Sequence, residues 1–220
     1  MAKIARQKKT REDRRGKASV IGRASPFSLK SDRIRFHFEE KSFPYDGTQL
    51  RHLFAYEKFG LLGTSLVAWK GACHVPLDKM IDGEDKFSKS EIRGDLMLHF
   101  VGEFFHKDIY FSVALQRLFA TMVLRQILKI RPEHFKHFVV SGDDLYYGQK
   151  KLSISIASIT GFSSMFHFAL NIENEGTPVP TVSLSELGVP VKQLVLEVFR
   201  EFREEYCSLV EATEKILFLS

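Results

Sequence analysis

The sequence predicts an α+β protein in which a mostly antiparallel central sheet is flanked by helices. The first observation is the segment 138–171, where apolar residues alternate with polar ones in three strand-like runs around turn residues. The second is a pair of longer segments, 112–130 and 191–216, in which apolar residues recur at helical spacing. We therefore expect a meander of three antiparallel strands, two of them a hairpin. The two long helices should cover one face of the sheet.

The composition is ordinary for a globular chain, with 44% hydrophobic and 27% charged residues. The 20 phenylalanines predict a large aromatic core. No apolar run approaches the ~18 residues that span a membrane, and no apolar signal segment follows the basic N-terminus. Cys73 and Cys207 are the two cysteines, so no disulfide framework is implied. We expect a cytoplasmic protein with no membrane partner.

Basic residues are concentrated at the N-terminus. Residues 1–30 hold ten Lys or Arg and two acids, whereas the whole chain has a formal net charge of +5, so the remainder is mildly acidic. This segment has too few bulky apolar residues to offset the entropy of ordering. We therefore expect a disordered arm over 1–33 and a single domain over 34–220. The arm can bind RNA by neutralising phosphates; a solubilising extension is an equally good interpretation.

Alternation and turn residues predict the first strands of the domain. Residues 34–38 alternate as a strand, and Pro44 and Gly47 mark a loop after it. A second strand is expected over 61–70, with Trp69 at its end. The Trp69 ring at a strand end can stack on a flat ligand or belong to the core.

A helix is expected between these strands, over 48–59, with Asp46 or Thr48 as its cap. Gln49 and Arg51 then fall in the first turn, where backbone amides favour anions. Asp46, Gln49 and Arg51 are therefore candidates for a ligand pocket. The alternative is a solvated helix start.

Residues 76–95 are the least regular part of the domain. Asp82, Glu84 and Asp85 form an acidic loop around a glycine. Carboxylates of this kind can hold Mg²⁺, as they do at many nucleotide sites. Their spacing does not fit an EF-hand, and a mobile polar loop is the alternative interpretation.

The middle of the chain predicts a buried strand followed by the clearest helix. Apolar residues occupy both parities of 96–105, which favours a strand buried on both faces. His99 lies within it, so it is either a core histidine with a hydrogen-bond partner or a ligand contact. The helix over 112–130 has Gln116 and Arg117 interrupting its apolar stripe, and we expect them to face outward or to cap the end of the sheet.

The C-terminal elements are predicted by capping residues. Ser183 and Glu186 form a capping box for one short helical turn that ends at Gly188. Pro190 then starts the last helix, which is amphipathic and runs to about residue 216.

Polar side chains collect along the meander over 138–171. Asp144 comes after the first turn, Lys151 begins the next strand, and His167 and Asn171 share a parity on the last one. An acid, an amine, an imidazole and an amide on neighbouring strands can bind an anionic or nucleotide-like ligand. The alternative is a solvated hairpin end, which is the common role of lysines after a turn.

A resemblance adds to this interpretation. The residues that carry it are Gly142-Asp143-Asp144-Leu145-Tyr146, Lys151-Leu152-Ser153 and His167-Phe168-Ala169-Leu170-Asn171. They resemble the biotin and lipoate protein ligase superfamily, in which an Asn-Asp precedes a strand, a lysine begins the next strand and a histidine begins a strand ending in Leu-x-Asn.

Two further phrases extend the resemblance over most of the chain from about Phe43 onward. They are Tyr45-Asp46-Gly47-Thr48-Gln49-Leu50-Arg51 and Met97-Leu98-His99-Phe100. With the Gly142–Tyr146 phrase they resemble an uncharacterised bacterial and archaeal family within that superfamily. Its fold is related to that of class II aminoacyl-tRNA synthetases, and its activity is undefined.

The resemblance implies a small-molecule ligand, with ATP and Mg²⁺ as possible cofactors. Lys151 is then expected to contact an acyl carbonyl or an acyl-adenylate phosphate, with Asp144 beside it as the second catalytic candidate. The expected ligand-binding residues are Asp46, Gln49, Arg51, Trp69, His99, Asp143, His167 and Asn171. The alternative function is a non-catalytic RNA- or synthetase-associated protein that uses the basic arm.

The chain departs from the ligase pattern at three places. The glycine- or arginine-rich loop that wraps the substrate is missing, and its nearest counterpart, 90–95, has one glycine. Asp143 stands where the superfamily has Asn, which adds a negative charge. No cysteine follows Asn171 over 172–178, which argues against a thioester intermediate. The resemblance therefore implies the fold more strongly than it implies acyl transfer.

Overall fold

The computed structural model describes residues 33–218 and contains a five-stranded central sheet. In spatial order its strands are β1 (Arg35–Glu39), β2 (Ser65–Val75), β3 (Ile92–Phe104), β8 (Ser164–Asn171) and β7 (Ser153–Ile159). β1 and β2 run parallel, and the other three pairs are antiparallel. The expected α+β class with a mostly antiparallel central sheet is confirmed. Residues 1–32 of the expected arm lie outside the described residues.

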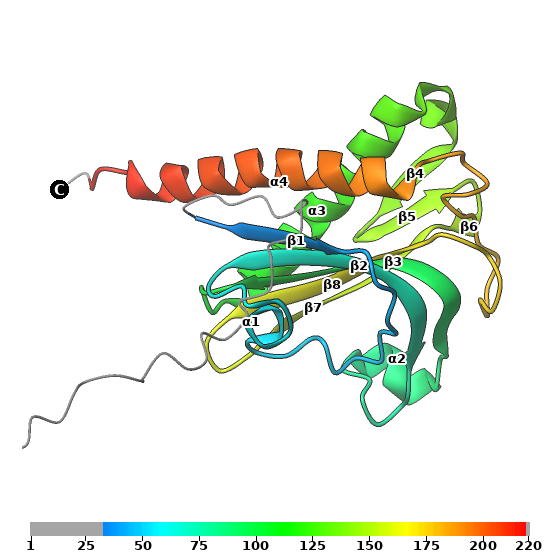
Figure 1. Cartoon of the computed structure of the whole chain (residues 1–220), viewed down its shortest axis with the longest axis horizontal. Helices are drawn as coiled ribbons and strands as arrows, with labels where there is room; N and C mark the ends of the chain where they lie inside the picture. The colour runs from blue at the N-terminus through cyan, green and yellow to red at the C-terminus, as the bar shows by residue number, and fades with distance from the viewer. Residues whose placement is uncertain (1–32, 219–220) are drawn as a thin grey trace, which may run out of the picture.

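Two long helices cover one face of this sheet, α3 (Ile109–Ile130) and α4 (Val191–Glu214) (Figure 1). α3 begins after Asp108, whose carboxylate accepts a hydrogen bond from the Phe111 amide at 2.7 Å. Phenylalanine rings from the sheet and from both helices form the core on this side, including Phe100 of β3, Phe119 of α3 and Phe199 of α4. Both predicted helices and the aromatic core are confirmed.

α3 is the one helix of the described residues that is long and apolar enough to cross a membrane by length and composition. Half of its most apolar window is buried inside the protein, and its buried residues pack into the core of the sheet. Burial against the sheet therefore accounts for the apolar composition of α3.

The opposite face of the sheet carries shorter elements, α1 (Phe54–Phe59) and α2 (Gly83–Ser88), with the loops around them (Figure 1). A second, smaller core lies on this face and includes Tyr45, Trp69 and Met97. β3 contributes to both cores, since Phe100 belongs to the first and Val101 to the second. This confirms the prediction of a strand buried on both faces.

The expected three-strand meander is corrected by the structure, because its first run leaves the central sheet. β4 (Phe138–Ser141), β5 (Asp144–Tyr147) and β6 (Lys150–Lys151) form a separate three-stranded antiparallel sheet. Gly142 has φ 65° in the tight turn between β4 and β5. The first run therefore pairs with β5, and not with the later run that becomes β7. After Lys151 the chain enters the central sheet, where β7 and β8 form the hairpin.

The helix expected over 48–59 is also corrected, because α1 begins at Phe54. Leu53 adopts a left-handed conformation with φ 61°, which interrupts the helical path. Asp46 closes a turn, accepting a hydrogen bond from the Thr48 amide at 3.1 Å. Gln49 and Arg51 therefore lie in turns before the helix, and the anion-binding first turn expected for them is absent from this segment.

Two further boundaries differ from the expectation. β2 continues to Val75, so Trp69 lies in the middle of the strand. Ser183 and Glu186 form the reciprocal hydrogen bonds of a capping box, at 3.2 and 3.0 Å, but they close a turn and not a helix. α4 then follows Pro190 as predicted.

Candidate functional site

A cleft with a volume of about 670 Å³ lies over the face opposite α3 and α4, near β7. Its floor comes from β3, β7 and β8, and includes Met97, Ile154 and His167. One wall is the small sheet of β5 and β6, and a second is the segment from Lys79 to Arg93 that contains α2. The loop 177–181 completes the rim. The cleft therefore joins segments that are far apart in the sequence.

Lys151 and Asp144 form an ion pair in the wall of this cleft. The Lys151 Nζ to Asp144 Oδ2 distance is 2.8 Å, and the two side chains are 27% and 24% exposed. β5 and β6 bring them together by pairing Tyr146 with Lys151. Burial raises the pKa of the Asp144 carboxyl, with the Asp143 charge acting in the same direction and Lys151 opposing both. The pair therefore places an oriented ammonium group beside the cleft.

Asn171 acts on the backbone of the same wall. Its side-chain amide donates to the Lys151 carbonyl at 3.2 Å and to the Val182 carbonyl at 3.3 Å. These contacts fix the point at which the chain passes from β6 to β7. Asn171 thus positions the Lys151 backbone, and it lines the cleft as the sequence pattern indicated.

His167 and His99 form a buried pair beneath the cleft. His99 Nε2 lies 3.1 Å from the Gly71 carbonyl oxygen, and His99 Nδ1 lies 3.1 Å from His167 Nε2. Because a carbonyl only accepts, His99 carries its proton on Nε2, and His167 Nε2 must then donate to His99 Nδ1. His167 Nδ1 is left as the lone-pair nitrogen. The Tyr45 ring stacks on His167 with a centroid distance of 3.7 Å.

Burial keeps both imidazoles neutral. It lowers the pKa of His99 to about 4, against smaller opposing contributions from backbone hydrogen bonds. It also lowers the pKa of His167 well below its ordinary value, and the neighbouring His99 adds to this effect. At neutral pH the pair is therefore a polar but uncharged part of the floor.

Side chains from two different elements donate hydrogen bonds to the Asp143 carboxylate. Its Oδ2 accepts a hydrogen bond from Gln116 Nε2 of α3 at 2.7 Å and another from Ser155 Oγ of β7. Of the two placements expected for Gln116 and Arg117, Arg117 faces outward, whereas Gln116 is 5% exposed and reaches Ser155 of the edge strand β7 at 2.7 Å. The physical reason is that the Asp143 carboxylate gives this buried amide a partner. The hydrogen bond between Gln116 and Asp143 was not predicted from the sequence.

The acidic residues around α2 have mixed roles. Asp82 caps this helix by accepting from the Glu84 and Asp85 amides at 2.9 and 3.2 Å. All three acids line the cleft. Within residues 33–218 there is no group of three or more His, Cys, Asp or Glu side chains that could hold a metal ion. Magnesium binding at these acids stays a prediction.

Five of the expected ligand contacts do not line the cleft. Asp46 pairs with Lys79 at 2.5 Å, and this contact lowers the Asp46 pKa to about 2. The Gln49 amide is bonded to the backbone of Asp46 and Pro44, both at 3.1 Å. Arg51 pairs with Glu57 on the surface at 2.5 Å.

The other two expected contacts are in the core. Trp69 is fully buried, and its Nε1 donates to the Phe43 carbonyl at 3.0 Å, which is the core alternative. His99 is also fully buried and reaches the cleft through His167. Neither side chain is placed to touch a ligand in the cleft directly.

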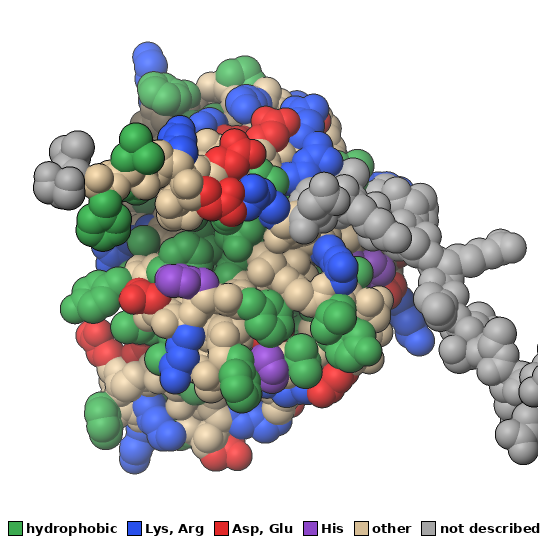
Figure 2. Space-filling model, turned by 90° about the vertical axis from the view of Figure 1, so that its left-hand side faces the viewer, with side chains coloured by type: hydrophobic (Ala, Val, Ile, Leu, Met, Phe, Trp, Pro, Cys, Tyr) green, Lys and Arg blue, Asp and Glu red, His purple; other side chains and the backbone are tan. Residues whose placement is uncertain are grey.

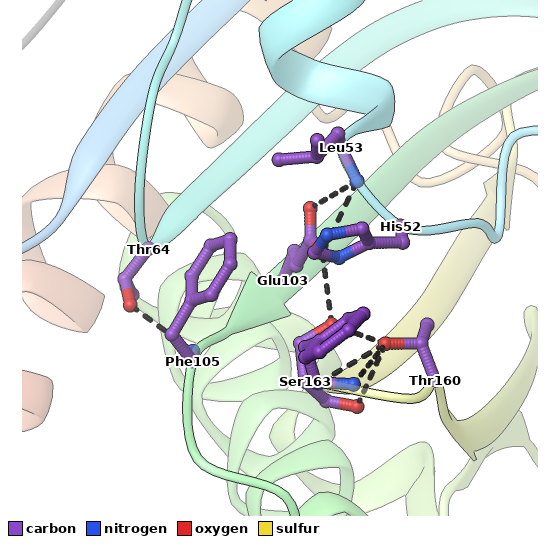
Figure 3. Close-up of polar contacts among 8 residues, drawn as sticks. His52, Leu53, Thr64, Glu103, Phe105, Thr160 and Ser163 are labelled. Atoms are coloured by element: carbon purple, nitrogen blue, oxygen red, sulfur yellow. Dashed lines mark hydrogen bonds and ion pairs between the residues drawn. The ribbon is translucent and has the colours of Figure 1, made fainter.

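A second polar cluster lies at the end of β3, where the sequence analysis placed no candidate. Glu103 is 3% exposed and accepts hydrogen bonds from the Leu53 amide, His52 Nδ1 and Ser163 Oγ (Figure 3). The signal in the sequence is a single acid inside the apolar run 96–105. These contacts join the turn before α1 to β3 and to the β7–β8 hairpin.

The surface beside this cluster is partly apolar. Phe105 and Phe162 flank the His52 ring, with centroid distances of 5.7 and 5.2 Å, and they are 44% and 71% exposed. Figure 2 shows exposed hydrophobic side chains beside histidines on one end of the molecule. Glu103 itself has all of its hydrogen bonds inside the protein, so we assign the cluster a structural role.

Two proteins without an assigned function are similar to this chain. It is 31% identical to a solved protein of unknown function from Pyrococcus horikoshi, with a TM-score of 0.77, over 85% of this chain and 100% of that one. It is 25% identical to an uncharacterized protein from Methanocaldococcus jannaschii, over 82% of this chain and 81% of the relative.

Biotin protein ligases share the fold at lower identity. A mutant of the Aquifex aeolicus enzyme, in complex with biotin, has a TM-score of 0.55 at 15% identity, over 80% of this chain and 71% of that one. The Leishmania major enzyme in complex with biotinyl-5-AMP has a TM-score of 0.52 at 13% identity, over 87% and 85%. These likenesses confirm the expected ligase-like fold and are too distant to show an activity.

A family described as "Domain of unknown function (DUF366)" matches residues 34–217, which is nearly the whole described domain. This chain belongs to that family.

Proposed function

We propose that the protein is a ligase-like enzyme that binds a small acyl, adenylate or nucleotide-like compound in the cleft, with Lys151 as its principal contact. The observation that carries the proposal is the Lys151–Asp144 ion pair in the wall of a cleft of about 670 Å³. A cleft of this size is in the range that accommodates cofactors and drug-sized ligands.

The chemistry proposed for Lys151 is electrostatic. An ammonium group that is already oriented can neutralise a phosphate or polarise a carbonyl without reorganising during the reaction. Asp144 orients the ammonium at 2.8 Å, and Asn171 holds the Lys151 backbone. ATP and Mg²⁺ are the cofactors that this proposal includes. They would supply an activated phosphoanhydride and charge compensation for its phosphates.

The fold supports the same proposal in a weaker way. Two of its structural neighbours are described in complex with biotin and with biotinyl-5-AMP. Those ligands show that this fold can host an acyl-adenylate in other proteins. They define the compounds to test first in this one.

A thermal-shift screen with biotin, lipoate, ATP with Mg²⁺ and an acyl-CoA tests the proposal. A ligand at ~100 times its Kd stabilises the folded protein by roughly 2.7 kcal/mol, which is roughly 5–10 °C for a domain of this size. In the Lys151→Ala variant the shift should fall to about half or less. Lys150→Ala is the matched control, because Lys150 is an exposed neighbour outside the cleft lining. A shift as large in Lys151→Ala as in the wild type would reject the site.

A second candidate function is RNA binding by the N-terminal arm. It is favoured by the ten Lys or Arg and two acids within residues 1–30. Binding through phosphates should weaken steeply as salt is raised, and deletion of residues 1–30 should abolish it. RNA affinity that survives this deletion would assign the binding to the folded domain instead.

A further inference from the structure

The charges that line the cleft favour a positively charged group on the ligand. Three cationic and six acidic side chains line it. The cations are already paired with acids, Lys151 with Asp144 at 2.8 Å, Lys79 with Asp46 at 2.5 Å and Arg93 with Asp95 at 4.0 Å. The cleft therefore has an excess of negative charge after its own ion pairs are formed.

Asp143 is the acid that is best prepared for such a group. Its carboxylate is oriented by Gln116 Nε2 at 2.7 Å and by Ser155 Oγ, which are both uncharged donors. No ion pair joins Asp143 to a cation within residues 33–218. Its charge also acts on Asp144 and raises the pKa of that carboxyl. Asp143 is thus a partly buried, fixed carboxylate whose charge has no cationic partner in the described domain.

Apolar side chains lie next to these charges. Met97, Ile154 and Ile156 contribute to the floor, and Leu50 and Met80 lie among the other lining residues. A ligand that is charged throughout would leave these surfaces without apolar contacts. A ligand with an apolar body and one charged end would bury them.

We infer that the cleft recognises a ligand bearing a primary ammonium group on an apolar body, with Asp143 as the carboxylate that receives the ammonium. This inference rests on the proposed function, since it concerns the same cleft and adds a positively charged group, at Asp143, to the acyl or phosphate group that Lys151 contacts. An ammonium donates up to three hydrogen bonds, and a fixed carboxylate offers charge-assisted acceptors for them. A bare divalent cation fits less well, because the described residues hold no group of three metal-ligating side chains.

The experiment compares three probes of equal chain length, hexylammonium, hexanol and hexanoate, by NMR titration of the full-length protein at pH 7.5. Hexylammonium is expected to bind about tenfold more tightly than hexanol, as is typical for one charge-assisted hydrogen-bonded contact. Asp143→Asn should remove this preference, because an amide keeps an acceptor for Gln116 and Ser155 but loses the charge. Asp78→Asn is the matched control at an exposed acid outside the cleft lining.

Each other outcome overturns the inference. It fails if hexanoate or hexanol binds as tightly as hexylammonium, if hexylammonium does not bind, or if Asp143→Asn binds it as well as the wild type. Mn²⁺, titrated in parallel without hexylammonium, should not bind at Asp143. Tight Mn²⁺ binding that depends on Asp143 would reassign the carboxylate to a metal. Loss of biotin or ATP stabilisation in Lys151→Ala, together with no ammonium preference, would retain the proposed function and reject only this inference.

Discussion

Replacement of Glu103 by alanine tests whether one buried acid holds three segments together. Glu103 lies at the end of β3 and is 3% exposed. The Leu53 amide donates to both of its oxygens at 3.2 and 3.0 Å, and His52 Nδ1 and Ser163 Oγ approach within 2.8 Å. Alanine would remove this acceptor from all three donors, and the Thr160 hydroxyl, 2.8 Å from Ser163 Oγ, would be the acceptor that remains beside Ser163.

The expected loss of stability follows from the burial of each donor. Ser163 is fully buried and cannot reach water, whereas the His52 side chain is 32% exposed and can be rehydrated. A hydrogen bond to a charged group contributes about 1.5–3 kcal/mol, and the two contacts of Glu103 that water does not readily replace are those from the Leu53 amide and Ser163 Oγ. We expect a total near 4 kcal/mol, which corresponds to a decrease in Tm of roughly 10 °C.

Urea unfolding monitored by circular dichroism measures this loss directly. The midpoint should decrease while the slope stays constant, because the same surface is exposed on unfolding. Glu133→Gln is the control at an exposed acid and should change stability by no more than ~0.5 kcal/mol. A Glu103→Ala variant within ~1 kcal/mol of the wild type would refute the structural role of the cluster.

Two further predictions concern the core beneath the cleft. Gly71→Ala should fail to fold or lose more than ~3 kcal/mol of unfolding free energy, because its Cβ would lie 1.8 Å from the Phe43 carbonyl oxygen. Gly161→Ala is the control and should be tolerated, because its Cβ would meet nothing within 4 Å. Equal expression and equal melting temperatures of the two variants would contradict the packing around Gly71. Stability should decrease as pH falls from about 6.5 toward 4, because the unfolded chain protonates histidines that the folded protein keeps neutral. For His99, with a pKa of about 4, this amounts to about 3 kcal/mol. The pKa of His167 is shifted in the same direction, so His167→Gln should flatten the pH profile of the unfolding free energy. An unchanged profile would show that the His167 imidazole titrates alike in the folded and unfolded states.

Local sequence patterns predicted the long elements well. α3, α4 and β3 have apolar spacings that extend over ten or more residues, and each exists close to the expected boundaries. Shorter elements depended on distant contacts. The apolar spacing after Thr48 resembles a helix, but the Leu53 amide is bonded to Glu103, fifty residues away, and the helix starts later.

The candidate site was predicted where strand alternation decides which side chains are neighbours. Asp144, Lys151, His167 and Asn171 all line one cleft, although Asp144 and Lys151 lie in the small sheet and not in one meander with β8, and their role in binding stays a prediction. The sequence could not assign Trp69 to the core or to the cleft. Alternation along a strand shows which side chains share a face, but it does not show which part of that face is covered by other residues. The contact between Gln116 and Asp143 was not predicted, because Asp143 follows 27 positions later and meets Gln116 only in the folded chain.

A calorimetric titration of biotinyl-5′-AMP into the wild type, Lys151→Ala and Lys150→Ala tests the central claim most directly. We expect binding to the wild type and to Lys150→Ala, and a loss of roughly 10- to 100-fold in affinity for Lys151→Ala, the value of one hydrogen bond to a charged group. Equal affinity of the two lysine variants, or no binding to the wild type, would contradict the assignment of Lys151 as the contact for an acyl-adenylate.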